Sequence, residues 1–149
     1  MELPELNLPK YEHQINNKEG KLFIYDFYRK KMVVLTPEEW VRQHFVHFLV
    51  NELNYPKSLI KIESGIAYNQ LQKRSDIKVY DRAGNPFAIV ECKASTIAIN
   101  KETFDQAATY NKTFQAPYIM VTNGMQHFCS EINFEENTSK FIDGFPNFE

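Results

Sequence analysis

The sequence predicts an α/β fold of the α+β kind, a β-sheet with helices packed on it. Three observations lead to this prediction: a capped helix start, strand-like runs on both sides of a turn-rich segment, and a second helix followed by a buried strand. The chain has 149 residues, of which 43% are hydrophobic, and this composition suits one domain with one core.

The first predicted elements are a hairpin and a helix. Residues 21–35, KLFIYDFYRKKMVVL, are strand-like, with a polar interruption at residues 29–31 that fits a hairpin turn. Thr36, Pro37 and two glutamates then supply a capping hydroxyl, a proline suited to the first helical position and acids that suit the helix dipole. An Asn-Tyr-Pro run predicts that this helix ends near Asn54.

The later elements are strands interrupted by a second helix. Strands are predicted at residues 58–67, 75–80, 86–94, 116–122 and 125–132, and the second helix at residues 100–114. The turn-rich residues 81–85 make a hairpin of the strands on either side of them. Residues 133–149 alternate phenylalanine with polar residues, and the pattern assigns them no element.

Composition narrows the class of protein. Apolar runs are short and broken by charge, so no membrane span is predicted, and the acidic, Pro-interrupted N-terminus is not a signal peptide. Cys92 and Cys129 set no disulfide framework, so free thiols in a cytoplasmic setting are expected. The formal net charge of -2 argues against a non-specific coat for nucleic acid, but it leaves a nuclease open because a metal site needs carboxylates.

A group of polar residues marks the hairpin strand at 86–94. Alternation puts Glu91 and Lys93 on one face and Cys92 on the other, although a strand entering solvent would also carry such a pair. Asp76 lies in the preceding strand, and the short connection brings its carboxylate near Glu91. Two such carboxylates suit Mg²⁺ or Mn²⁺, and the backbone carbonyl of Cys92 could be a further ligand. Lys93 could orient a water and offset phosphate charge.

Three residues on the helices are further candidates. A rotation of about 100° per residue puts Glu52 on one stripe with Phe45 and Leu49, so its carboxylate is expected to face the core and to need a partner or a metal. The alternative is that the last helical turn has already left the core. Gln106 and Tyr110 lie four apart on one side of the second helix, where they could steady a phosphate or the lysine, or only border the core.

These residues resemble the motifs of a known superfamily. Asp76 followed by Glu91-Cys92-Lys93 is similar to the motif of the PD-(D/E)XK nucleases, with Ser75 in place of the usual proline. The run QAATY at residues 106–110 resembles the Gln-x-x-x-Tyr motif of one branch. The run TPEEWVRQHFVHFLVNELNYP resembles the N-terminal nuclease domain of type I restriction enzyme R subunits and its stand-alone relatives, and the similarity covers roughly residues 35–132.

The resemblance implies a restriction-endonuclease-like fold, with a mixed central β-sheet flanked by helices and an added N-terminal β-hairpin. It also implies Mg²⁺-dependent endonuclease cleavage of DNA. The roles it carries over are Asp76 and Glu91 as metal ligands, Lys93 as the water-orienting amine, Glu52 as an accessory acid that could bind a metal through water, and Gln106 and Tyr110 as supports.

The expected organisation is a single nuclease-like domain over residues 1–149, with an N-terminal extension at 1–20, a core at 35–132 and a C-terminal extension at 133–149. An R subunit would carry a motor region that does not follow here, so a stand-alone member or a fragment is expected. A helicase or translocase and other restriction subunits are then expected partners. Cutting of both DNA strands would favour a homodimer.

Two other functions stay open. One is a non-catalytic nucleic-acid-binding or assembly module of the same fold, and the other is hydrolysis of RNA or of a small phosphodiester. A requirement for a divalent metal and loss of activity in Lys93→Ala separate a nuclease from the first of these alternatives.

Overall fold

Two β-sheets and two α-helices are seen in the computed structural model, which describes residues 3–63 and 76–148. The smaller sheet is antiparallel and consists of β1 (Ile15–Lys18), β2 (Lys21–Asp26) and β3 (Lys31–Val34). The larger sheet consists of β4 (Ile60–Ile62), β5 (Ile77–Tyr80), β6 (Pro86–Cys92), β7 (Tyr118–Thr122), β8 (His127–Asn133) and β9 (Thr138–Ile142). A short 3-10 helix, Lys57–Leu59, leads into β4.

The larger sheet is mixed, as the sequence predicts. Its strand order is β4-β5-β6-β7-β8-β9. The pair β6 and β7 runs parallel, and the four other neighbouring pairs run antiparallel. A parallel pair needs a crossover connection, which here contains the second helix, α2 (Lys101–Phe114). The β5–β6 hairpin forms where the turn-rich segment predicts it.

Both helices begin at the predicted caps. The first helix, α1 (Pro37–Asn51), starts behind Thr36, whose hydroxyl accepts a hydrogen bond from the backbone N–H of Glu39 at 3.0 Å. The second starts behind Asn100, whose side chain accepts from the backbone of Thr103 at 3.1 Å. The first helix ends at Asn51 with Glu52 as its C-cap, which is earlier than the predicted end at residue 54.

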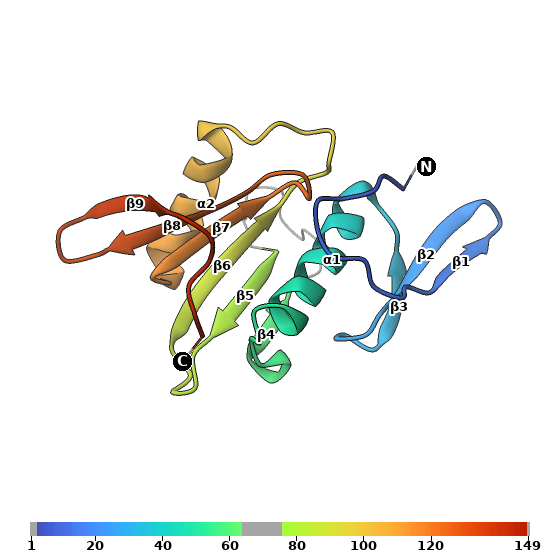
Figure 1. Cartoon of the computed structure of the whole chain (residues 1–149), viewed down its shortest axis with the longest axis horizontal. Coiled ribbons are helices and arrows are strands. Elements are labelled where there is room, and N and C mark those ends of the chain that lie inside the picture. The colour runs from blue at the N-terminus through green and yellow to red at the C-terminus, as the bar shows by residue number, and fades with distance from the viewer. Residues whose placement is uncertain (1–2, 64–75, 149) are drawn as a thin grey trace.

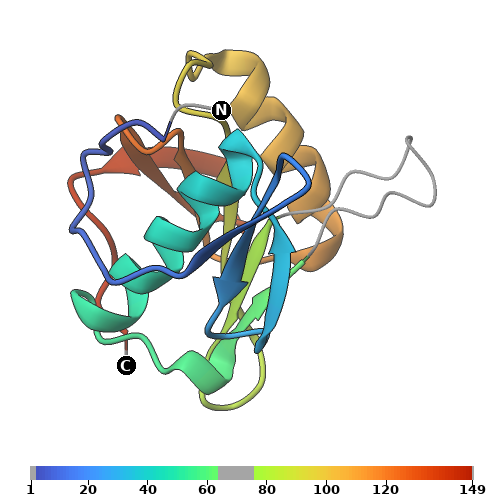
Figure 2. The ribbon, with the colours of Figure 1, turned by 90° about the vertical axis from the view of Figure 1, so that its right-hand side faces the viewer.

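The two helices cover opposite faces of the larger sheet (Figures 1 and 2). On the α1 face, buried residues of β5, β6, β7 and β8 form one core cluster with α1: Ile77, Val79, Ala88, Val90, Cys92, Met120 and Cys129 from the strands, and Val41, Phe45, Val46 and Leu49 from the helix. On the α2 face, Ile89, Ile119 and Val121 pack with Ala107. The pleat therefore sends alternate residues of β6 to different helices.

The N-terminal and C-terminal segments differ from the sequence prediction. The predicted hairpin at 21–35 forms, but β1 adds a third strand, and β9 forms in the segment that the pattern left unassigned. The strand predicted at 58–67 is shorter, and its residues 64–67 lie outside the described residues, as does residue 75. Figure 1 shows the smaller sheet beside α1, on the far side from the larger sheet.

Two further expectations concern the cysteines and membrane spans. Both cysteines are free, as predicted, and both are buried. Within residues 3–63 and 76–148, no helix is long and apolar enough to pass through a membrane.

The cap at Thr36 fixes where α1 begins, and Thr36→Ala should lower the free energy of unfolding by about 1 kcal/mol, because an N–H in the first turn loses its acceptor. Thr36→Ser keeps the hydroxyl and serves as the matched control. Urea denaturation of the three proteins measures the difference. Equal stability of the two variants would show that the hydroxyl does not stabilise the helix.

Candidate active site

The carboxylates of Asp76 and Glu91 come from the residue before β5 and from β6, and these two strands pair antiparallel. Asp76 directly precedes β5, and its backbone N–H donates to the carbonyl of Val90 at 3.1 Å. Glu91 follows Val90 on β6 and alternates onto the α2 face with Ile89. This register places the two acids side by side at the open end of the hairpin, away from its turn, as the sequence predicts.

Glu91 lies in an unfavourable environment for a negative charge. Its side chain is 17% exposed, and that of Asp76 is 16% exposed. Burial is the largest cause that raises the pKa of Glu91, to about 8, and the negative charges of Asp76 and Glu38 raise it further. Lys93 and Arg42 act in the opposite direction. Two acids held together in this way are suited to bind a cation.

The ammonium of Lys93 lies beside Glu91. It follows β6, and its Nζ lies 3.8 Å from Oε1 of Glu91. The backbone N–H of Lys93 donates to the carbonyl of Thr122 at 2.8 Å, which anchors the main chain at this point. The structure thus brings together the three residues that the sequence singled out at this hairpin.

Cys92 faces away from this group, as alternation predicts. The residue is 1% exposed and belongs to the core cluster on the α1 face, where burial raises the pKa of its thiol well above the ordinary value. Its backbone N–H donates to Oδ2 of Asp76 at 2.7 Å. Cys92 therefore contributes to the site through its main chain.

Arg42 and Glu39 of α1 also reach this site, although the sequence motifs identify neither of them as a site residue. Arg42 is buried; its Nη2 donates to Oδ1 of Asp76 and its Nη1 to Oε1 of Glu39, each at 2.6 Å. Burial lowers the pKa of Arg42, but the negative charges of Asp76 and Glu39 together raise it more, so the guanidinium stays charged. The three-residue spacing of Glu39 and Arg42 was a visible signal, but it did not show that Arg42 reaches a strand.

The prediction that Glu52 directs its carboxylate at the core is wrong. Glu52 is exposed and caps the C-terminus of α1, just past the last helical residue. It lies thirteen residues after Glu39, or about 20 Å along the axis of an α-helix. The stripe that includes Phe45 and Leu49 is indeed buried, but the helix ends before it reaches Glu52. Glu39, near the other end of α1, is the helical acid tied to Asp76.

The two candidates on α2 are half-buried, and one of them contacts a different lysine from the expected one. Gln106 and Tyr110 both lie within α2. The ring centroid of Tyr110 is 5.3 Å from Nζ of Lys78, which also pairs with Glu63 at 3.3 Å. Lys78 is two residues from Asp76 on β5, so a second cation lies close to the acids. Strand alternation from Asp76 could have identified it.

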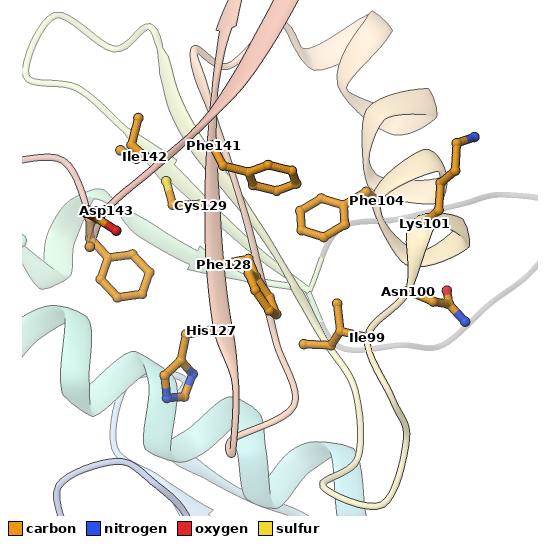
Figure 3. A pocket seen from close by; sticks show the side chains of 12 residues that line it. Ile99, Asn100, Lys101, Phe104, His127, Phe128, Cys129, Phe141, Ile142 and Asp143 are labelled. Atoms are coloured by element: carbon orange, nitrogen blue, oxygen red, sulfur yellow. The ribbon is translucent and has the colours of Figure 1, made fainter.

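A separate apolar pocket lies at the β8–β9 edge of the larger sheet (Figure 3). Phe104 of α2, Phe128 of β8 and Phe141 of β9 converge on it. Among the described residues, its lining is Ile99, Asn100, Lys101, Phe104, His127, Phe128, Cys129, Phe141, Ile142, Asp143, Gly144 and Phe145. None of the residues around Asp76 and Glu91 belongs to this lining, so the pocket is distinct from the candidate active site.

Comparison with known proteins identifies the family. Residues 37–146 match the family model described as the type I restriction enzyme R protein N terminus, and the chain belongs to this family. The matched segment contains both helices and the whole larger sheet, together with every residue of the candidate site. This match confirms the predicted resemblance to the N-terminal domain of type I restriction enzyme R subunits. A search of curated proteins found no match.

The raised pKa of Glu91 predicts an unusual pH dependence. Between pH 5 and 8, approximately, the folded protein retains a proton on Glu91 that the unfolded chain has lost. With EDTA present, this group therefore lowers the free energy of unfolding as the pH rises through that range. Urea denaturation at pH 5, 6.5 and 8 measures the effect, and Glu91→Gln should remove it. The same decrease in both proteins would contradict the assignment of the proton to Glu91.

Proposed function

We propose that this chain is a metal-dependent nuclease domain of the PD-(D/E)XK type, which hydrolyses phosphodiester bonds of DNA. The observation that carries the proposal is the group at the hairpin end: two carboxylates, Asp76 and Glu91, with the ammonium of Lys93 at 3.8 Å from Glu91. Membership in the type I restriction R protein family supports DNA as the substrate and other restriction subunits as partners.

The residues at this site fit a hard divalent cation such as Mg²⁺, with Mn²⁺ as a substitute. Burial and the neighbouring charge of Asp76 raise the pKa of Glu91, so a bound cation would stabilise the ionised pair, and oxygen donors suit these ions. Among the described residues, no three or more His, Cys, Asp or Glu side chains gather to hold a metal. The ligands would therefore be Asp76, Glu91, the carbonyl of Cys92 and water, which agrees with the preference of Mg²⁺ for keeping several waters.

Each side chain then has a distinct role in hydrolysis. Asp76 and Glu91 would hold the cation, which when bound supplies charge stabilisation for the phosphate and lowers the pKa of water. Lys93 would donate a hydrogen bond to the attacking water and balance negative charge that develops on the phosphate. Lys78, next to Tyr110, provides a second positive charge for the DNA backbone. Gln106 is a candidate to steady a phosphate of the DNA through its side-chain amide.

Cleavage of supercoiled plasmid in Mg²⁺, Mn²⁺ or EDTA tests this proposal. The wild-type protein should nick DNA only with a divalent metal, and Lys93→Ala should lower the rate by about 10²-fold or more, because one preorganised donor is lost. Lys57→Ala removes an exposed lysine from the 3-10 helix and is the matched control.

Either of two results would count against a nuclease. Equal cleavage by wild type and Lys93→Ala would point to a contaminant. A wild-type protein that binds DNA without cutting it under any metal would favour the non-catalytic module, and cleavage of RNA in preference to DNA would correct the substrate.

The placement of the helical acids gives a second test. Glu52→Gln should leave the cleavage rate unchanged, because Glu52 is an exposed cap residue. For the same reason it should leave the free energy of unfolding within about 0.5 kcal/mol of wild type. Glu39→Gln should lower cleavage, since it removes the negative charge that Arg42 contacts. Cleavage and urea denaturation of both variants provide the comparison. A larger loss of cleavage in Glu52→Gln than in Glu39→Gln would contradict this assignment.

A further inference from the structure

A chain of ion pairs connects Asp76 to the smaller sheet. Arg42 contacts both Asp76 and Glu39. The other oxygen of Glu39 accepts from Nη2 of Arg29 at 2.9 Å, and Arg29 in turn pairs through Nε with Asp26 at the end of β2. Positive and negative side chains alternate along this chain of ion pairs, from the smaller sheet through α1 to the hairpin of the candidate site.

These charged groups are shielded from water. The side chain of Asp26 is 0% exposed, those of Glu39 and Arg42 are 7% exposed, and that of Arg29 is 11% exposed. Removing one member of such a buried chain leaves an uncompensated charge, which is strongly unfavourable. The positions of neighbouring members are therefore coupled.

Additional hydrogen bonds fix the chain of ion pairs at Asp26, its end on the smaller sheet. Oδ1 of Asp26 accepts from the backbone N–H groups of Tyr28 and Arg29 at 2.8 and 2.9 Å, so the β2–β3 turn orients this carboxylate. The side-chain amide of Gln43 donates to Oδ2 of Asp26 at 3.1 Å and to Oε2 of Glu39 at 2.8 Å. Asp26 and Glu39 are thus held in one arrangement by both the turn and the helix.

At the other end of the chain of ion pairs, the carboxylate of Asp76 is held in a single orientation. Arg42 contacts Oδ1, and the backbone N–H of Cys92 contacts Oδ2. One contact comes from α1 and the other from β6. Among the contacts of the described residues, a shift of the guanidinium would leave Asp76 the backbone contact from Cys92 and would let the carboxylate rotate away from Glu91.

We infer that Arg42 is a positioning residue for Asp76, and that the smaller sheet, acting through Asp26 and Arg29, holds Arg42 in place. This inference rests on the proposed nuclease function. The strands β1, β2 and β3 precede the segment that matches the family model, residues 37–146. The smaller sheet is therefore an additional element that completes the ion-pair chain of a site lying within the family segment.

The test measures the Mn²⁺ requirement of the full chain in two ways: the dissociation constant of Mn²⁺ by isothermal titration calorimetry, and the Mn²⁺ concentration that gives half-maximal plasmid cleavage. Arg29→Met should raise both values roughly 10-fold, the effect of removing an outer partner of a metal ligand. In the variant, Glu39 keeps Arg42 as its partner among the described cations, so Arg42 is drawn toward Glu39 and no longer holds Asp76 in a fixed orientation. Asp26→Asn tests the same link without shortening a side chain, and it replaces Arg29→Met if that variant does not fold.

Two control variants separate positioning from general destabilisation. Lys31→Met removes a positive charge from an exposed site on β3, and Ile24→Val weakens the packing of β2 without changing a charge. Both should keep the wild-type Mn²⁺ requirement. In a Glu39→Gln background, Arg29→Met should add no further change, because the link from Arg29 to Arg42 is already interrupted.

The outcomes distinguish the inference from the proposed function. Wild-type protein without metal-dependent cleavage would contradict the proposed function and, with it, the inference. Wild-type cleavage combined with an unchanged or lowered Mn²⁺ requirement in both Arg29→Met and Asp26→Asn would overturn the inference alone. An equal increase in Ile24→Val would also overturn it, since general destabilisation would then account for the effect.

Discussion

The buried contact between Arg42 and Asp76 is the interaction on which the arrangement of this molecule depends. It joins α1 to the hairpin of the larger sheet at the point where that hairpin carries its acids. Through Glu39 and Arg29 the same guanidinium is tied to the smaller sheet. The guanidinium of Arg42 therefore connects α1, the β5–β6 hairpin and the N-terminal strands. Apolar packing holds α1 against the rest of the larger sheet.

The charges at the hairpin are balanced unequally. Arg42 contacts Glu39 as well as Asp76, and Lys93 lies near Glu91 at 3.8 Å without a short contact. Burial raises the pKa of Glu91 most, and among the described residues the negative charges of Asp76 and Glu38 add to this effect, so negative charge is in excess around Glu91. A divalent cation would correct this excess. An arrangement that is costly for the isolated protein is thus consistent with a role in binding metal.

Local chemistry made much of the fold and part of the site predictable. The caps at Thr36 and Asn100 predicted both helix starts, and the two-residue period of a strand placed Glu91 opposite Cys92. Glu52 was misplaced because periodicity gives the direction of a side chain only while the helix continues. Arg42 could not be identified, since its partner Asp76 is 34 residues away and tertiary packing alone brings them together.

Anomalous diffraction from crystals soaked in Mn²⁺ would test the proposed metal site most directly, because it locates the ion without relying on activity. We expect a peak at about 2.1 Å from a carboxylate oxygen of Asp76 and of Glu91, with the carbonyl of Cys92 as a further ligand. Soaked crystals of Asp76→Asn should lose the peak. A wild-type crystal at saturating Mn²⁺ with no peak between these two acids would contradict the assignment of this hairpin as a metal-dependent active site.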